Sequence, residues 1–311
     1  MLLSFAGGPI ASRLLGHNGY DQFPYAANID LKPVGPFTRV PALNTAPGNT
    51  ASGGLAPPPP GTKTTLLVFG ADGPLGRDEL IRVLDGGKTS LEIAITAVLI
   101  ALVVGLPLGA LSGYFGGATD ALVARLTDTV MAFPLMLFLV FASVQLDAVL
   151  DPIGYGWWFP PGVLAEAMLI GAFTSFYPTR LVRAQVLQLR QSEFVEAAEM
   201  VGASRRRILV RHLSPHLIPT MLVWGAVAVA TNILIEVGLS FIGAGVQVST
   251  ATWGSLLSTT WGTLLAPQTY TSTGFTPWQT VFPTVAILLS VLSLNQLSEG
   301  LRHALDPWGS R

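Results

Sequence analysis

The sequence has no cysteine and few charged residues. Without cysteine, a disulfide scaffold, a thiolate metal site and a cysteine nucleophile are all excluded. Only 11% of the 311 residues are charged, whereas soluble domains average roughly 25%, which argues against an ordinary soluble enzyme. The net charge of -1 leaves no strongly basic surface, so nucleic acid is not expected as a partner.

Long apolar runs are the main positive feature. Hydrophobic residues make up 50% of the chain, and the mean hydropathy is +0.54. A helix of about 20 residues crosses a hydrocarbon core about 30 Å thick. Five windows of this kind hold few charges: 91–113, 126–146, 163–182, 217–242 and 281–301. Because they lack the alternation of barrel strands, the sequence predicts an all-α, polytopic membrane helix bundle with five complete transmembrane helices.

Arginine and lysine are distributed unevenly between the loops. Loops 147–162 and 243–280 contain neither residue. Seven arginines lie at the end of the third window or between it and the fourth: Arg180, Arg183, Arg190, Arg205, Arg206, Arg207 and Arg211. Short basic loops stay in the cytoplasm. The Arg-rich loop and the C-terminal tail are therefore predicted inside, and everything before residue 91 outside.

The N-terminal part of the chain falls into two segments. Residues 1–15 are too short and too interrupted by glycine and proline for a complete span, and we interpret them as the remnant of a first, sixth transmembrane helix. A peripheral N-terminal arm is the alternative. Residues 16–88 are expected to form an extracytoplasmic loop, extended where proline and glycine are frequent. A short amphipathic helix over 75–88 should lead into the transmembrane domain, residues 89–308.

Two patterns that suggest a bound ligand are rejected. Residues 86–89 resemble the end of a phosphate-binding loop, but Arg82 stands where that loop needs glycine. Any ATP hydrolysis is therefore assigned to another chain, and this chain is expected to hold no cofactor. His212 and His216 share a helical face, yet no third ligand accompanies them, so no metal site is expected.

Two features inside the apolar windows are candidates for packing or transport. Gly105, Gly109 and Gly113 recur every four residues, which predicts close packing against a helix of this chain or of a partner subunit. Glu236 lies in an apolar helix, where an ionisable group costs at least about 2.5 kcal/mol unless it is paired or hydrated. It is interpreted as a helix–helix hydrogen-bonding group or, with Ser240, as part of a translocation path.

The inside loop, residues 183–216, has the pattern of a capped helix. Ser192 is a favourable N-cap, Glu193 and Glu196 suit the positive end of the helix dipole, and Gly202 suits a C-terminal stop. An apolar stripe follows from four residues with helical spacing: Phe194, Ala197, Ala198 and Val201.

A second helix is predicted to follow directly. Ser204 should cap it, and it should run through residues 205–207 to Pro215 and into the next window. A short helix continuous with two spans can transmit a partner's movement to the membrane domain.

The segment Glu196-Ala197-Ala198-x-x-x-Gly202, with Pro215 thirteen residues after the glycine, resembles the EAA loop of ABC importer permeases, which docks into a groove of the ATPase subunit. His212 and Ser214 stand where isoleucine and leucine are usual. The resemblance implies an ATPase-coupling role for the following residues: Glu193, Phe194, Glu196, Ala197, Ala198, Val201, Gly202, Arg205, Arg206 and Pro215.

Further segments are similar to the C-type subunit of the dipeptide/oligopeptide/nickel branch of this family. They follow in the family's order: residues 75–78, 113–117, 236–254 and 300–307. The likeness covers about residues 74–308. The outer loop lacks the prolines that usually precede Trp253.

The resemblance implies a type I ABC importer permease that forms half of a translocation path. Its expected partners are a second permease subunit, two cytoplasmic ATPases that hold ATP and Mg, an extracytoplasmic substrate-binding protein and the lipid bilayer. The expected location is the plasma membrane of a bacterium or an archaeon. Peptides are the commonest substrates of this branch, and nickel or another small solute is the alternative.

Two other classes of membrane protein are alternatives to this interpretation. An ion-driven secondary transporter or a channel should carry paired carboxylates or a broken helix near the midplane, and the few buried charges disfavour it. A membrane scaffold or sensor would not interact with an ATPase.

Overall fold

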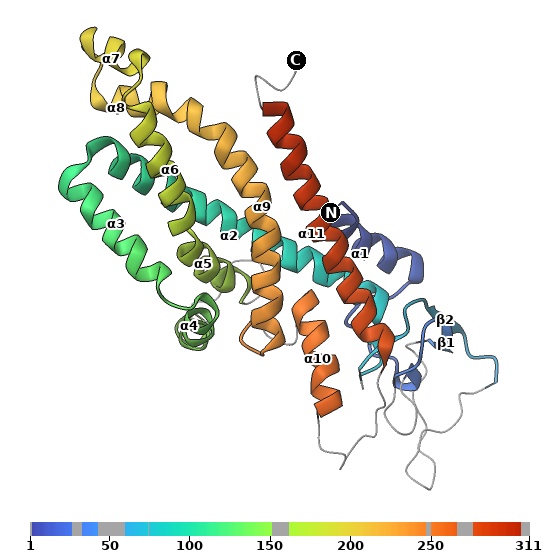
Figure 1. Ribbon diagram of the computed structural model, residues 1–311. Coiled ribbons are helices and arrows are strands. Elements are labelled where there is room, and N and C mark those ends of the chain that lie inside the picture. Colours follow the sequence, from blue (N-terminus) through green and yellow to red (C-terminus); the bar gives the residue numbers. More distant parts are fainter. Residues whose placement is uncertain are drawn as a thin grey trace. The chain divides into compact units, whose positions relative to one another are not determined.

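The computed structural model describes residues 2–26, 33–42, 60–73, 75–150, 162–246, 250–265 and 276–305. Most of them are helical (Figure 1). The helices are α1 (Leu2–Leu15), α2 (Glu79–Phe115), α3 (Gly117–Met131), α4 (Leu135–Leu150), α5 (Val163–Thr174), α6 (Phe176–Leu189), α7 (Glu193–Met200), α8 (Arg205–Arg207), α9 (Ser214–Phe241), α10 (Trp253–Leu265) and α11 (Pro277–Leu305), with a 3-10 turn at Pro24–Ala26 and a π-helix at Ile208–Leu213. The short strands are β1 (Thr38–Pro41), β2 (Thr64–Leu67), β3 (Ala71–Asp72) and β4 (Arg77–Asp78).

The chain divides into two compact units. The first comprises Met1–Leu91 and Val237–Ser290, and the second comprises Glu92–Glu236 and Val291–Arg311. Helices α2, α9 and α11 each contribute residues to both units.

Within the described ranges, three helices are long and apolar enough to cross a bilayer: α2, the continuous helix Arg205–Phe241 and α11. A fourth span results if α3 and Leu135–Ser143, which are bent by 84° relative to each other, are counted as one broken span. The window 163–182, predicted as a single span, is divided between α5 and α6. The window 126–146 is likewise divided, because it crosses the break at residues 132–134 between α3 and α4. All five predicted windows are mostly helical, and their number as complete spans stays a prediction.

The break between α5 and α6 has a local cause. Pro178 has no N–H, so the carbonyl of Thr174 loses the donor that a regular helix supplies. Helical hydrogen bonds persist on both sides: Ser175 N donates to Gly171 O at 3.0 Å, and Thr179 N donates to Ser175 O at 3.1 Å. The interruption is therefore confined to the single residue between the two helices.

In the second unit, three glycines bring α2 into close contact with α6. A Cβ at Gly105 would lie 2.6 Å from the carbonyl oxygen of Ser175, and one at Gly113 would lie 2.8 Å from that of Arg183. Gly109, between them, is equally close to the same helix. The neighbour that the sequence left open is thus a helix of this chain, and a row of glycines lets the two backbones approach.

The outer segment, residues 16–88, differs from the expected extended loop. Strand β1 pairs antiparallel with β2, with Val40 opposite Thr65. Phe23, Val40 and Leu67 are at most 2% exposed and pack in one small core. Apolar residues from both ends of the segment meet there, which the local composition does not reveal. Residues 43–59, which hold the run of prolines, lie outside the described part.

Helix α2 begins at a well-defined cap. Asp78 Oδ1 accepts hydrogen bonds from the backbone N–H groups of Leu80 at 2.9 Å and Ile81 at 3.3 Å, as an N-cap residue does. The helix expected over 75–88 is therefore the first part of α2, which continues without interruption to Phe115.

Buried charges connect the N-terminal residues of the first unit to the start of α2. His17 Nε2 lies 2.9 Å from Asp78 Oδ2, and Asp72 Oδ2 lies 2.9 Å from Arg77 Nη2 and 2.5 Å from Arg82 Nε. Burial lowers the pKa of His17, but the hydrogen bond and charge of Asp78, together with the Leu15 carbonyl and the charge of Asp21, raise it, and the net pKa lies above its ordinary value.

The predicted outer loop 243–280 contains the helix α10. Its first residue, Trp253, is buried in the first unit. The indole N–H donates to Val83 O at 2.9 Å, and the backbone N–H donates to Ser90 Oγ at 3.2 Å. Both bonds attach α10 to α2.

Candidate functional site

Helix α7 ends as the sequence predicts. Gly202 has a φ of +81°, in the left-handed region that favours glycine. Its N–H donates to Glu199 O at 2.9 Å, and the N–H of Ala203 donates to Ala198 O at 3.0 Å, the hydrogen-bond pattern of a glycine-terminated helix. A Cβ at Gly202 would meet nothing within 4 Å, so backbone conformation alone constrains this position.

The two predicted caps behave differently. Ser204 Oγ accepts a hydrogen bond from Arg207 N at 3.4 Å, as expected of an N-cap. Ser192 has the extended backbone of an N-cap, but its hydroxyl donates to Leu189 O at 2.5 Å and does not cap α7. The Ser192 hydroxyl therefore ties the start of α7 to the end of α6.

Helix α7 has an inner and an outer face. Val195 is 2% exposed, and Ala198 packs beside it on a buried cluster of the second unit. The other buried members of this cluster are Val182, Val186, Ile208, Leu213, Leu217 and Met221. On the outer face, Phe194, Met200 and Val201 are 37%, 79% and 90% exposed. The predicted stripe is thus divided: Ala198 turns inward, and Val195, which lay outside the stripe, is the buried anchor. The i, i+3 spacing of Val195 and Ala198 was the available signal.

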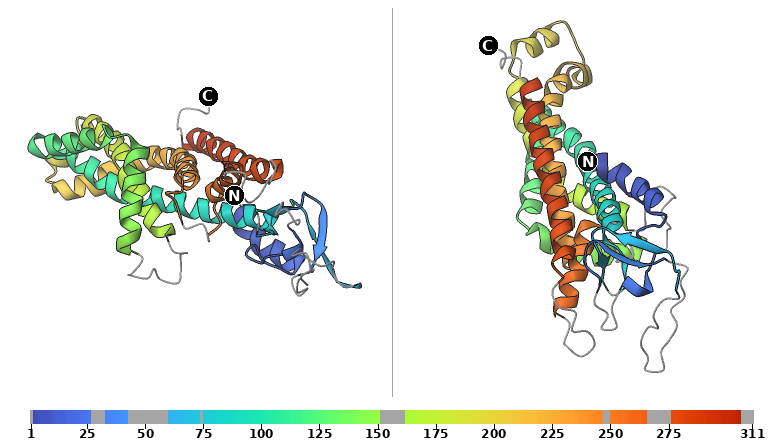
Figure 2. Two further views of the ribbon diagram at one scale, coloured as in Figure 1. Left: turned by 90° about the horizontal axis from the view of Figure 1, so that it is seen from below. Right: turned by 90° about the vertical axis from the view of Figure 1, so that its right-hand side faces the viewer.

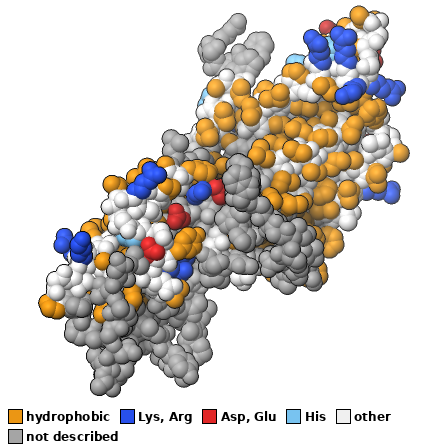
Figure 3. All heavy atoms as spheres, turned by 180° about the vertical axis from the view of Figure 1, so that it is seen from behind, with side chains coloured by type: hydrophobic (Ala, Val, Ile, Leu, Met, Phe, Trp, Pro, Cys, Tyr) orange, Lys and Arg blue, Asp and Glu red, His pale blue; other side chains and the backbone are white. Residues whose placement is uncertain are grey.

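The basic residues gather at the same end of the second unit. Figure 1 shows α7 and α8 beyond the ends of α6 and α9, and the right-hand view of Figure 2 shows the two short helices grouped there. In Figure 3, lysine and arginine side chains border a broad apolar surface at this end. Arg205 and Arg206 are exposed residues of α8. An apolar surface with a basic margin is typical of a membrane domain that meets water.

Polar contacts join α6 to the turn between α2 and α3. The Arg183 guanidinium donates from Nε to Asp120 Oδ1 and from Nη2 to Asp120 Oδ2, the latter at 2.8 Å. Ser112 Oγ donates to the same carboxylate at 2.6 Å. Arg190 Nη1 donates to Gly113 O at 3.2 Å. These bonds add directional contacts to the close approach of α2 and α6.

Helix α7 and its neighbour α8 also reach other elements. Tyr114 Oη donates to Glu199 Oε1 at 3.4 Å, and the Arg205 guanidinium carbon lies 5.9 Å from the centre of the Phe115 ring. The Phe194 ring lies 5.1 Å from that of His216 on α9. Residues of the α7–α8 segment thus contact the ends of α2 and α9, so a displacement of α7 would reach both helices.

The passage from α8 into α9 is a π-helix. Pro215 lies just inside α9 and has no N–H to donate to the preceding turn. The Ser214 hydroxyl donates to Leu209 O at 2.8 Å, five residues back. The wider π turn accommodates the proline without ending the helix, which stays continuous over Arg205–Phe241.

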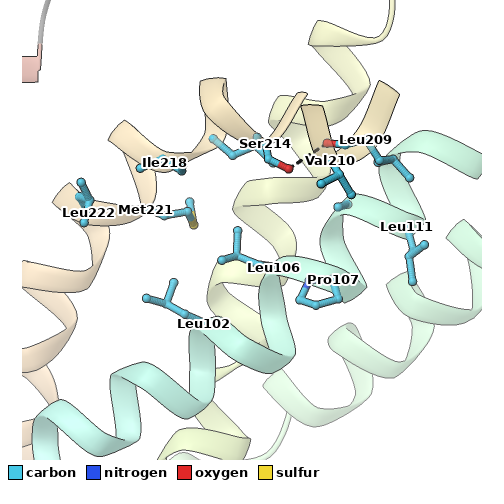
Figure 4. A pocket seen from close by; sticks show the side chains of 12 residues that line it. Leu102, Leu106, Pro107, Leu111, Leu209, Val210, Ser214, Ile218, Met221 and Leu222 are labelled. Carbon is cyan, nitrogen blue, oxygen red and sulfur yellow. Dashed lines mark hydrogen bonds between the residues drawn. The ribbon is translucent and has the colours of Figure 1, made fainter. Parts of the chain in front are cut away.

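An apolar cavity of about 510 Å³ lies between α2 and this passage. Figure 4 shows Leu102, Leu106 and Pro107 of α2 across from Val210 and Ile218. Leu111, Val210, Ile218 and Leu222 in its lining are 42%, 64%, 55% and 49% exposed, so this cavity is an open apolar groove that leaves space beside the start of α9.

The polar residues of α9 form a row. Glu236 is fully buried, and Ser240 is buried one turn later, 3.5 Å from the hydroxyl of Thr252. Asn232, one turn before Glu236, is buried as well. Sequence reasoning missed Asn232, although its spacing of four from Glu236 was a usable signal.

Comparison with known proteins agrees with this architecture. Residues 105–310 match the family described as binding-protein-dependent transport system inner membrane component. The oligopeptide transport system permease protein OppC of Haemophilus influenzae is 36% identical over 239 residues, which are 77% of this chain and 70% of OppC. The dipeptide transport system permease protein DppC of Alkalihalophilus pseudofirmus is 34% identical over 241 residues, which are 77% of this chain and 71% of DppC.

Among solved structures, a chain of the MetNI methionine ABC transporter in an inward-facing conformation superposes with a TM-score of 0.55 at 15% identity. The match covers 72% of this chain and 96% of that one, and it shows a shared fold. The predicted helical, polytopic membrane fold and the predicted family are both confirmed. The chain belongs to the family of binding-protein-dependent transport system inner membrane components, the permease subunits of ABC importers.

Proposed function

We propose that this chain forms half of the translocation path of an ATP-driven importer of peptides. Its relatives include permeases named for oligopeptides, for dipeptides and, in Escherichia coli, for glutathione at 36% identity. These names favour peptides over nickel or another small solute, the alternatives that the sequence left open. Membership of the permease family argues against an ion-driven transporter or a scaffold.

The partners follow from the same proposal. Two cytoplasmic ATPases bind ATP and Mg and carry out hydrolysis, while this chain supplies no catalytic residue. A second permease subunit completes the path, and an extracytoplasmic protein delivers the substrate. The loop 183–216 and the C-terminus lie in the cytoplasm of the bacterial or archaeal cell, and residues 16–88 lie outside.

The single observation that carries the coupling role is the form of α7. Its outer face presents Phe194, Met200 and Val201 to a groove of an ATPase, and its inner face is held by Val195. A helix whose outer face is apolar and exposed fits the helix-in-groove mode of recognition. Because α7 contacts the ends of α2 and α9, movement of the ATPases shifts both helices and opens the path alternately to the two sides.

A pair of glycine variants tests the coupling role. Gly202→Leu places a side chain on a backbone with positive φ, which costs about 1–2 kcal/mol and distorts the end of α7. Gly300→Leu in the regular helix α11 is the matched control, since a Cβ there also meets nothing within 4 Å. In vesicles that contain the complete importer, we expect Gly202→Leu to abolish ATP-driven uptake and weaken ATPase co-purification. Normal uptake by Gly202→Leu would reject the docking role.

The charge at the start of α7 offers an independent test. Glu196→Lys reverses an exposed charge in the first turn of α7. We expect the variant to insert normally and to lose coupling between ATP hydrolysis and uptake. Glu299→Lys, an equally exposed position on α11, is the control for the charge change itself.

The substrate class is tested on the unaltered importer. Dipeptides, longer peptides and nickel are each supplied with the delivering protein, and ATP hydrolysis is measured. Stimulation by peptides is expected. Stimulation by nickel alone would reject the peptide substrate and leave the ATP-driven importer standing.

A further inference from the structure

Besides the apolar cavity next to Pro107, the second unit contains another cavity, which is lined in part by Asn232 of α9. Its volume is about 280 Å³. It is lined by Leu135 of α4, by Thr174 and Tyr177 on either side of the α5–α6 break, and by Trp224, Thr231 and Asn232 of α9. We call it the Asn232 cavity.

The amide of Asn232 is the unusual group in this lining. The side chain is 2% exposed, and its Nδ2 donates to no atom of the residues that the structure describes. The neighbouring hydroxyls do have acceptors: Thr174 Oγ1 donates to Ile170 O at 2.7 Å and Thr231 Oγ1 donates to Val227 O at 3.2 Å. A buried donor without an acceptor is rare and costly, so this amide has an unmet hydrogen bond that a water, a partner subunit or a ligand can satisfy.

The lining also defines the chemistry of that ligand. None of the described residues around the cavity is charged, and none is a histidine or cysteine. A transition-metal ion such as nickel would find no histidine, cysteine or carboxylate ligand there, and a charged peptide terminus would find no counter-charge. A neutral carbonyl oxygen is the complement of the Asn232 amide. The rings of Tyr177 and Trp224 provide apolar faces for an adjoining side chain.

The cavity is open and smaller than a complete ligand site. Tyr177 and Val227 are each 43% exposed, and complete small-molecule pockets usually measure roughly 300–1,000 Å³. The Asn232 cavity therefore has room for part of a peptide, and the second permease subunit would close it. Asn232 also precedes Glu236 by one turn, so the cavity extends the expected path along α9.

Resting on the proposed function, we propose that the Asn232 cavity is a peptide subsite of the translocation path, in which the Asn232 amide donates to a backbone carbonyl of the passing peptide. A backbone carbonyl is present in every peptide whatever its sequence. Such a contact suits an importer that accepts many side chains, because Tyr177 and Trp224 recognise apolar surface and not a particular residue.

Because the chain has no cysteine, a single cysteine introduced at the cavity is the only thiol of this chain that a thiol reagent can label. Thr231→Cys places a thiol at the exposed edge of the cavity, and Leu234→Cys places one on an exposed part of the same helix outside the lining. The importer is assembled with cysteine-free partner subunits and treated with a water-soluble methanethiosulfonate. We expect Thr231→Cys to be labelled and Leu234→Cys to be labelled far more slowly.

Peptide should protect only the cavity position. At a peptide concentration ten times its Kd, occupancy slows labelling of Thr231→Cys by about tenfold, and labelling of Leu234→Cys stays unchanged. If the wild-type importer transports peptides but Thr231→Cys is unlabelled or unprotected, the subsite is rejected and the proposed function stands. If the wild type transports no peptide, the proposed function fails and the subsite fails with it.

A second variant pair tests the hydrogen bond itself. Asn232→Leu removes the amide at similar size, and Asn295→Leu makes the same change at an exposed position of α11. Loss of one hydrogen bond predicts an about three- to tenfold lower kcat/KM for peptide uptake. The decisive readout is a peptide whose carbonyl is replaced by a methylene group. The wild type and Asn295→Leu should discriminate against this analogue, and Asn232→Leu should not. Equal discrimination by all three proteins would overturn the proposal.

Discussion

Gly109 of α2 lies so close to Thr179 of α6 that a Cβ on the glycine would stand 2.5 Å from the Thr179 carbonyl oxygen. Real Cβ atoms do not approach backbone oxygen to this distance, so a larger residue has to move one of the two helices. With Gly105 and Gly113 in the same row, the contact makes α2 and α6 a closely packed pair next to α7.

The first prediction concerns this contact. Gly109→Ala should lower the free energy of unfolding by about 1–3 kcal/mol, because the added methyl overpacks two backbones. Gly225→Ala on α9 is the matched control, since its Cβ would lie 3.7 Å from a Val98 side chain in ordinary contact. Thermal unfolding in detergent should separate the two variants. An unchanged melting temperature for Gly109→Ala would contradict the prediction.

The second prediction concerns the Arg183–Asp120 pair. Its two parallel hydrogen bonds, with a third from Ser112, place it among the stronger kinds of ion pair. Asp120→Asn should lower the free energy of unfolding by about 1–3 kcal/mol. Asp128→Asn is the control.

Asp128 lies 3.4 Å from Arg180, and both side chains are more than 60% exposed. Exposed pairs of this kind contribute about 0–1 kcal/mol. Chemical unfolding in detergent measures both variants. Equal effects would show that the geometry of the Arg183–Asp120 pair adds no stability.

The third prediction is a pH dependence from His17. Burial lowers its pKa, but Asp78, the Leu15 carbonyl and Asp21 together raise the pKa in the folded protein above the ordinary value of 6.5. A raised pKa means that protonation favours the folded state. This stabilisation is complete below the unfolded pKa and is lost as pH rises through the folded pKa.

The measurement compares wild type with His17→Gln between pH 5.5 and 8.5. The melting temperature of the wild type should exceed that of His17→Gln most at the acid end, and the gap should narrow as pH rises. Arg13→Gln, in α1, is the control for loss of a nearby positive charge. A gap that widens with pH would show that the sign is wrong.

The fourth prediction concerns the apolar cavity between α2 and the start of α9. Leu106→Phe adds bulk where the structure leaves space, so the protein should become slightly more stable, by up to about 1 kcal/mol. If α9 moves into this space during transport, uptake should fall while the subunits still assemble. Leu288→Phe on α11 lies outside the described cavities and serves as the control. Unchanged uptake by Leu106→Phe would show that the space is not used.

Local patterns were enough to predict several parts of the molecule. The left-handed Gly202, the cap at Ser204 and the helical nature of the apolar windows depend on interactions within a few residues. The same approach misjudged Ser192, whose hydroxyl donates to Leu189 O at the end of α6 and does not cap α7. It also did not predict the interruption at Ser175 within the window 163–182, since hydropathy does not register the missing N–H of Pro178.

Non-local contacts could not be predicted in this way. The outer segment 16–88 has the composition of an extended loop, yet Phe23 and Leu67, 44 positions apart along the chain, share one core. The ion pair of His17 with Asp78 joins residues that are 61 positions apart in sequence. In the sequence, each of these four residues is an ordinary polar or apolar residue. Only the folded path of the chain shows which residue each of them contacts.

By itself, the sequence determined that this protein is a helical membrane protein with a glycine-terminated α7, because hydropathy, backbone preference and capping act over one or two helical turns. The ABC importer permease family followed from the resemblance of its EAA segment and further motifs to known permeases. Only the tertiary structure decided which helix covers Gly109, which face of α7 Val195 occupies, and that Asn232 lines a cavity while its Nδ2 meets no acceptor among the described residues. Those outcomes depend on how distant segments pack, and close packing is a property of the assembled helices.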